Sequence, residues 1–144
     1  MLAKKEDPTR VFWDMSTCPV PSGYPASRVG PCIKRGLKKL GYTGRVSITG
    51  LGILKNFSTD VLKELYSSRV SLTNLETTKF GLQVQISCWI DGIPPLENLM
   101  LISGERNFIP YLGILERMRV KVIRELPFDD EPKTTTSNPL DYPV

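Results

Sequence analysis

The chain has 144 residues, which suits a single domain, and 40% of them are apolar, enough to form a buried core. The sequence contains no histidine, which excludes serine–histidine–aspartate and cysteine–histidine catalysis, histidine general bases and zinc sites built on histidine. The net charge of +4 permits a nucleic-acid partner but does not demonstrate one.

The three cysteines are Cys18, Cys32 and Cys88, which lie far apart and match no zinc-binding spacing. Free, buried thiols are the simplest interpretation, and they favour an intracellular protein. No apolar run approaches the roughly 18 residues that a membrane span requires. The charged N-terminus lacks the pattern of a secretory signal. We therefore expect no membrane partner.

The first half of the chain is predicted to alternate between strands and helices. Residues 1–9 are polar and are expected to be disordered. Residues 10–14 form a short buried strand that ends in Asp14, and a loop rich in proline and glycine follows. Apolar residues recur at helical spacing across residues 28–40, which predicts a helix. A strand, a helix and a third strand are then predicted at 45–50, 59–67 and 69–75.

The two helices predicted in this half present different faces to solvent. Opposite its apolar face, the first carries four basic residues, Lys34, Arg35, Lys38 and Lys39. A solvated surface is the ordinary explanation for such a run, and a phosphate-binding surface is the alternative. The second helix has Ser58 or Thr59 as its expected N-cap. Its apolar face is expected to contain Val61, Leu62, Leu65 and Tyr66.

The second half of the chain is less regular. Residues 78–91 are ambiguous, because alternation of apolar residues favours a strand while a second spacing fits a helix over 79–90. A buried strand is predicted at 98–103, a helix at 107–118 and a last strand at 119–124. The tail is rich in proline and threonine, cannot build a core, and is expected to be flexible.

Alternating strands and helices predict a parallel sheet with helices on both faces. In open sheets of this kind, ligands bind at the carboxyl ends of the strands. Asp14 ends the first strand, and Glu105 and Asn107 follow the fourth. The topology can therefore bring these polar side chains to one edge. Asp14 has a second interpretation, since an acid at a strand end can simply cap the following loop or pair with a lysine.

Four motifs, in this order, resemble the NYN domain: "VFWDMSTCPVP", "LGYTGRVSITGLG", "IPP" and "NLMLISGERNF". The resemblance is closest to plant members related to the meiosis regulator and mRNA stability factor family. It implies an NYN domain at residues 10–125, between a disordered segment at 1–9 and a flexible tail at 126–144. It also implies the PIN-like fold, an α/β three-layer α/β/α sandwich with a mainly parallel five-stranded sheet, and a helix over 79–90.

The resemblance further implies an intracellular protein of RNA metabolism, cytoplasmic or nuclear, with peroxisomal association as a family property. Family members are similar to metal-dependent ribonucleases, in which clustered carboxylates hold Mg²⁺ or Mn²⁺ and the metal activates water. Their opening motif is typically Asp-Ile-Glu-Asn-Cys. Here Asp14 and Cys18 keep the first and last residues, while Ser16 replaces the glutamate and Thr17 the asparagine. Both replacements offer only neutral oxygens.

Further acidic positions of the family are also replaced. Residues 51–53, Leu-Gly-Ile, stand where Tyr-Gly-Asp is typical. In the element Lys-Asp-x-x-Asp-Lys, Leu75 and Thr78 occupy the acidic positions and Lys79 keeps the last lysine. Glu76 is the only carboxylate nearby. These losses all fall on functional polar positions and leave the apolar framework intact.

The last motif has Glu105 and Asn107 in place of two aspartates. At most three carboxylates, Asp14, Glu105 and Glu76, are therefore left for Mg²⁺ or Mn²⁺, with Asn107 as a neutral ligand. Asp14 and Glu105 are the remnant catalytic candidates. The cofactor is accordingly expected to be absent, or to be Mg²⁺ or Mn²⁺ if the site survives.

Three functional hypotheses follow. The first is a degenerate NYN domain with weak or no nuclease activity that binds single-stranded RNA or a protein partner. The second is an active Mg²⁺- or Mn²⁺-dependent endoribonuclease, and the third is a homodimerisation or scaffold domain without RNA affinity. The expected RNA contacts are Lys34, Arg35, Lys38, Lys39, Lys79 and Arg106.

Overall fold

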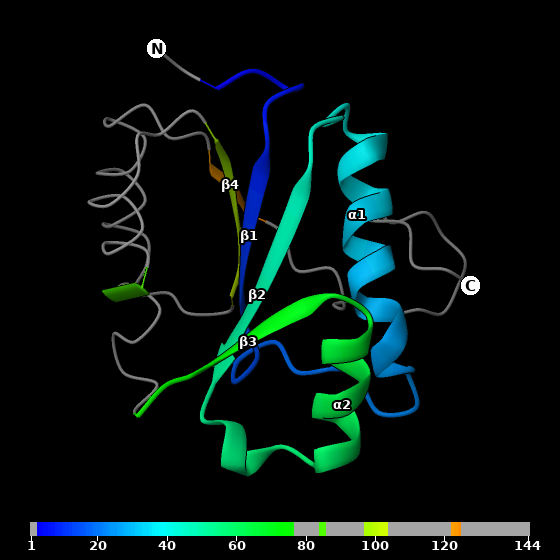
Figure 1. Cartoon of the computed structure of the whole chain (residues 1–144), viewed down its shortest axis with the longest axis vertical. Coiled ribbons are helices and arrows are strands. Elements are labelled where there is room, and N and C mark those ends of the chain that lie inside the picture. The colour runs from blue at the N-terminus through cyan, green and yellow to red at the C-terminus, as the bar shows by residue number, and fades with distance from the viewer. Residues whose placement is uncertain (1–2, 77–83, 86–96, 104–121, 125–144) are drawn as a thin grey trace.

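The computed structural model describes residues 3–76, 84–85, 97–103 and 122–124. Its centre is a sheet with the strand order β3-β2-β1-β4-β5, in which every neighbouring pair is parallel (Figure 1). The strands are β1 (Thr9–Asp14), β2 (Val46–Gly52), β3 (Val70–Asn74), β4 (Asn98–Ile102) and β5 (Val122–Arg124). The prediction of an α/β fold with a parallel sheet is confirmed.

Two α-helices and two short 3₁₀ helices connect the first three strands. They are η1 (Ala26–Arg28), α1 (Val29–Lys39), η2 (Leu54–Asn56) and α2 (Thr59–Ser67). The Ser58 hydroxyl accepts a hydrogen bond from the Val61 N–H at 3.1 Å, so Ser58 is the N-cap of α2. Gly41 follows α1 with a φ of 97°, a conformation that glycine adopts without steric cost.

The bounds of these elements agree with the sequence prediction to within two residues in β1 to β4, α1 and α2. Apart from residues 84–85, the helices predicted at 79–90 and 107–118 lie outside the described residues, as does the tail at 126–144. Within the described ranges, no helix is long and apolar enough to cross a membrane.

The connections place a topological switch beside β1. From β1 the chain builds β2 and β3 on one side, and then returns to the other side of β1 to form β4. Trp13 of β1 is in register with Ile102 of β4. The residues that follow them, Asp14 and Ser103, therefore lie side by side at the ends of these two strands. Ligands of open parallel sheets bind where the strand order reverses in this way.

The helices α1 and α2 cover one face of the sheet (Figure 1). Val11 and Trp13 of β1 pack there in a single cluster with Ile33 and Leu37 of α1. On the opposite face, Phe12, Leu51, Leu99 and Leu101 are buried too. Burial on both faces is the normal state of a parallel sheet.

One residue of the predicted apolar face of α2 is exposed, while Val61 and Leu62 are half-buried against the core. Leu65 is 1% exposed, whereas the side chain of Tyr66 is 73% exposed. Successive residues of an α-helix are rotated by about 100°, because a turn contains 3.6 residues. Tyr66 is therefore turned well away from Leu65, and the helix is too short to bring both against the sheet. The assignment of Tyr66 to the buried face is wrong.

The N-terminal segment makes specific contacts, in contrast to the disorder that its polar composition suggests. The side-chain amide of the fully buried Asn98 donates to the Lys4 carbonyl oxygen at 2.9 Å. The Lys5 ammonium donates to the Leu40 carbonyl at the end of α1, also at 2.9 Å. The Lys4 N–H donates to the Asp7 carboxylate at 2.8 Å. Residues 3–8 therefore close the amino end of the sheet.

We predict that Asn98→Ala lowers the free energy of unfolding by about 2 kcal/mol, because it removes a buried amide and its hydrogen bond to Lys4. The same variant should be cleaved faster by trypsin at Lys4 and Lys5. Urea unfolding and limited proteolysis measure the two effects. Ser47→Ala, at an exposed position of β2, is the control and should change stability by less than about 0.5 kcal/mol. Equal stability of the two variants would contradict the prediction.

Candidate functional site

Asp14 stands at the carboxyl end of the central strand, beside the topological switch. Its side chain is 7% exposed. A carboxylate this deeply buried must be hydrogen-bonded, since burial of an unsatisfied charge is very costly. The identity of its partners therefore defines what this edge of the sheet can do.

Three donors surround the Asp14 carboxylate. Oδ1 accepts a hydrogen bond from the Ser16 backbone N–H at 3.1 Å. Oδ2 accepts one from the Thr17 hydroxyl at 2.8 Å and another from the Ser103 hydroxyl at 3.1 Å. An ionised carboxylate offers about four lone-pair sites. Only about one of them remains open for any other ligand.

The local chain explains why Asp14 adopts this role. The Met15 N–H donates to the Leu51 carbonyl at 2.9 Å, which extends the β1–β2 pairing by one residue. The Cys18 N–H then donates to the Asp14 carbonyl at 3.0 Å and closes a turn. An aspartate that bonds to the N–H two residues ahead is a common way to start such a turn. Asp14 therefore caps the loop that follows β1, one of the two interpretations that its sequence position allows.

The aromatic residues near this loop are structural. Trp13 is fully buried, and its indole N–H donates to the Cys18 carbonyl at 2.7 Å. It belongs to the core and presents no face for a nucleobase. Burial, together with the Cys32 thiol beside it, raises the pKa of the Tyr24 hydroxyl above its ordinary value. Tyr24 is therefore protonated at neutral pH and offers no general base.

The second carboxylate of the predicted site, Glu76, is exposed and lies two residues beyond the end of β3. Because β2 separates β3 from β1, about 10 Å of sheet lies between their backbones. In the described ranges, no group of three or more histidine, cysteine, aspartate or glutamate residues gathers to hold a metal ion. Glu105 and Asn107 lie outside these ranges.

The described part of the edge does not fit a divalent metal ion. Mg²⁺ requires near-octahedral oxygen coordination. The Ser16 N–H is a fixed donor that cannot turn a lone pair toward a cation, and two hydroxyls already occupy the other oxygen. Beside β2, polar groups at this edge are already paired with each other in hydrogen bonds between neutral groups. There the Leu54 N–H donates to the Asn74 side-chain oxygen at 2.9 Å and the Leu75 N–H to the Gly52 carbonyl at 2.8 Å.

The basic residues predicted on α1 are exposed, as expected for either interpretation. The helix runs antiparallel to β1, and its last turn lies beside the N-terminal segment, where Lys5 bonds to Leu40 (Figure 1). Lys38 and Lys39 therefore lie near the amino end of the sheet, away from Asp14. The structure does not bring them to the edge that carries Asp14. Lys79 and Arg106 lie outside the described residues.

Ser103 is the site residue that sequence reasoning missed. It was visible only as part of the motif "LISG", whereas in the fold its hydroxyl reaches the Asp14 carboxylate. The available signal was its position directly after a buried strand, at the same edge as Asp14. Polar residues at neighbouring strand ends are expected to meet, and this rule applies to serine as well as to acids.

The family model described as NYN domain matches residues 8–139, which is most of the chain. No curated protein matches the chain. The matched range contains β1, the turn that Asp14 caps, and Ser103. It also extends beyond residue 125, where the sequence motifs placed the end of the domain.

We predict that Asp14→Ala lowers the free energy of unfolding by about 2–4 kcal/mol, because three donors lose their acceptor. Asp14→Asn should cost only about 1 kcal/mol. Its carbonyl oxygen can still accept from Ser16, and its amide can donate to the two hydroxyls, which rotate to accept. Urea unfolding of the two variants measures the difference. If Asp14→Ala were as stable as the unmodified protein, the capping role would be disproved.

Proposed function

The chain belongs to the NYN domain family, and from this premise we propose that it acts in RNA metabolism as a binding domain with weak or no nuclease activity. Membership supports a PIN-like α/β fold and an RNA-related, nuclease-like class of function. The further step, from nuclease-like to binding without efficient cleavage, is our proposal. Its partner is single-stranded RNA or a protein that takes part in RNA regulation.

The hydrogen bonding of Asp14 carries this proposal. The N–H of Ser16 and the hydroxyl of Thr17 donate to its carboxylate. These two residues stand where the resemblance expects a glutamate and an asparagine. The threonine at position 17 thus does more than remove a possible ligand, because its hydroxyl occupies an acceptor site of the acid that remains. The bond from position 16 comes from the backbone and does not depend on the replacement there. Metal-assisted cleavage of a phosphodiester needs acids whose lone pairs face the cation.

Fewer acids at this edge also favour RNA binding without a metal. Each carboxylate repels the phosphate backbone, and each lysine or arginine that contacts a phosphate releases counterions. The four exposed basic residues of α1 support phosphate contacts, which we propose together with Lys79 and Arg106.

An active endoribonuclease is the alternative, favoured by the bond between Ser103 and Asp14. Glu105, the second acid of this alternative, follows Ser103 by two residues in the sequence. Glu76 would complete the acidic set. A dimerisation or scaffold domain without RNA affinity is the third possibility. Measurements of RNA cleavage and RNA binding on the same samples separate these three functions.

We expect no cleavage of labelled single-stranded RNA in Mg²⁺ or Mn²⁺ above that of Asp14→Asn, which keeps the fold and removes the charge. We also expect binding that weakens as salt rises. Gel analysis and filter binding on the same samples measure both. Cleavage that Asp14→Asn abolishes would establish the endoribonuclease. Absence of RNA binding even at low salt would favour the dimerisation or scaffold domain.

We further predict that changing Lys34, Arg35, Lys38 and Lys39 of α1 to glutamine weakens RNA binding. The slope of log affinity against log salt should fall by about 0.7 for each side chain that contacts a phosphate. A control variant changes Lys4, Arg45 and Lys55, which are equally exposed and lie elsewhere, to glutamine. If both variants bound alike, the loss would reflect net charge alone, and α1 would not be a specific contact surface.

A further inference from the structure

Tyr66 presents an aromatic ring to solvent at the end of α2. The side chain is 73% exposed, although aromatic side chains usually bury most of their area in a core. Among the described residues, Val84 is the other large apolar side chain that is exposed, and it is smaller than tyrosine and not aromatic. A single exposed apolar residue carries no meaning by itself. The surroundings of Tyr66 supply the argument.

Two cations flank Tyr66 at equal spacing along the chain. Lys63 precedes it by three residues, which places the two side chains next to each other on the helix surface. Arg69 follows it by three residues, at the start of the next strand. Both cations are exposed, and neither forms an ion pair with any other residue that the structure describes. Tyr66 thus has one cation three residues before it on the helix, and a second three residues after it that borders the same depression.

Arg69 has an unusual backbone. Its φ is 75°, and it is the one non-glycine residue with a positive φ in the described ranges. A bulky side chain pays a steric cost in this region, where glycine would be the default. The turn is fixed by the Arg69 N–H, which donates to the Tyr66 carbonyl at 3.1 Å. Arg69 follows the C-cap Ser68 of α2, a position where a left-handed residue commonly ends a helix, so this conformation sets where the arginine leaves the helix.

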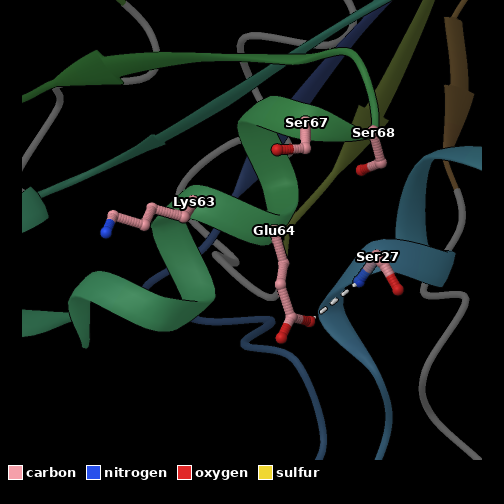
Figure 2. Close-up of a pocket in the computed structure, with 5 residues that line it drawn as sticks. All are labelled: Ser27, Lys63, Glu64, Ser67 and Ser68. Carbon is pink, nitrogen blue, oxygen red and sulfur yellow. Dashed lines mark hydrogen bonds between the residues drawn. The ribbon is translucent and has the colours of Figure 1, made fainter.

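The surface beside the ring is hollowed. One depression of about 500 Å³ is bordered by Tyr66, Ser67, Arg69, Val70 and Ser71. A second, of about 240 Å³, is bordered by Ser27, Lys63, Glu64, Ser67 and Ser68 (Figure 2). Ser67 borders both, so the two depressions adjoin. Both depressions are open to solvent, so they offer a contact surface and not an enclosed site.

Among the residues that border the two depressions, Glu64 is the one acid, and its side chain points away from Tyr66. Figure 2 shows the Glu64 side chain extending toward η1, where its carboxylate accepts a hydrogen bond from the Ser27 N–H at 3.3 Å. Residues two apart on a helix do not face each other, so Glu64 does not share the face of Tyr66. The groups around the ring are therefore cations and serine hydroxyls.

We propose that Lys63, Tyr66, Ser67 and Arg69, here called the Tyr66 surface, bind single-stranded RNA. One nucleobase stacks on the Tyr66 ring, and the two cations contact the phosphates on either side. The Ser67 hydroxyl can donate to a phosphate oxygen or to a ribose 2′-hydroxyl. This inference rests on the proposed RNA binding, and it adds α2 and the residue before β3 to the contacts proposed for α1.

The chemistry favours RNA over a peptide at this place. A peptide strand that pairs with β3 would use backbone groups and would not need a ring flanked by cations. The Tyr66 surface also lies at the amino end of β3, whereas Asp14 lies at the carboxyl end of β1. RNA held here is not held across the depleted acidic edge.

The first test measures the affinity of the full chain for a short oligouridine at low salt. Tyr66→Ala should weaken binding about tenfold, and Tyr66→Phe, which keeps the ring, should bind as the unmodified protein does. Arg69→Gly removes the charge without steric cost. It should lower the slope of log affinity against log salt by about 0.7, the value expected for one phosphate contact. Circular dichroism and thermal unfolding check that each variant is folded.

The second test maps the contact directly. Ultraviolet crosslinking to an oligouridine that contains 5-bromouridine, followed by trypsin, should mark the peptide of residues 64–69, which ends in Arg69. The peptide of residues 29–34 from α1 is the internal comparison. A mark on 64–69 that Tyr66→Ala removes supports the proposal. A mark elsewhere, with unchanged affinity of Tyr66→Ala, overturns it and leaves RNA binding intact.

Two further outcomes are decisive. Absence of any RNA binding by the unmodified chain contradicts the proposed RNA binding and this inference together. If Tyr66→Ala left RNA affinity unchanged but disrupted a dimer seen by sedimentation, the surface would be a protein contact. That result would overturn the assignment of the Tyr66 surface to RNA, and it would leave the proposed RNA binding of the chain standing.

Discussion

The hydrogen bond between the Ser103 hydroxyl and the Asp14 carboxylate joins the ends of the two central strands at the point where the strand order reverses. A carboxylate that is 7% exposed cannot be left without donors, so the chain around it has to supply them. The Ser16 N–H and the Thr17 hydroxyl do so, and they shape the turn after β1. In the part of this edge that the structure describes, hydrogen-bond donors from three residues therefore surround the Asp14 carboxylate.

Most of the fold was predictable because its signals are local. The period of apolar residues marks α1, and short apolar runs between turn residues mark β1, β2 and β4. The partners of Asp14 were harder to predict, since Ser103 lies 89 positions away and its contact depends on the register of β1 against β4. Sequence alternation indicates which face a residue takes, but it does not give the register between distant strands.

Two errors of sequence reasoning have distinct physical causes. Polar composition suggested a loose N-terminus, yet Asn98 binds the carbonyl of Lys4, and backbone groups have no signature in composition. Tyr66 was assigned to the apolar face of α2, but the helix packs along the line of Leu65 and leaves the ring outside. The first error concerns stability alone. The second conceals a feature that bears on function, because a large apolar side chain left in water is informative when charges accompany it.

Affinity and cleavage depend on different atoms in this fold. Cleavage would require acids with open lone pairs at the carboxyl edge, where the described oxygens of Asp14 are largely occupied. Affinity for RNA requires cations and an exposed ring, and α1 and α2 present these along the helical layer. In the function that we propose, replacement of acids at one edge would therefore leave the proposed binding groups untouched and would reduce repulsion of phosphate. A nuclease-like domain with this distribution of groups can lose its chemistry while it retains the contacts that hold the strand.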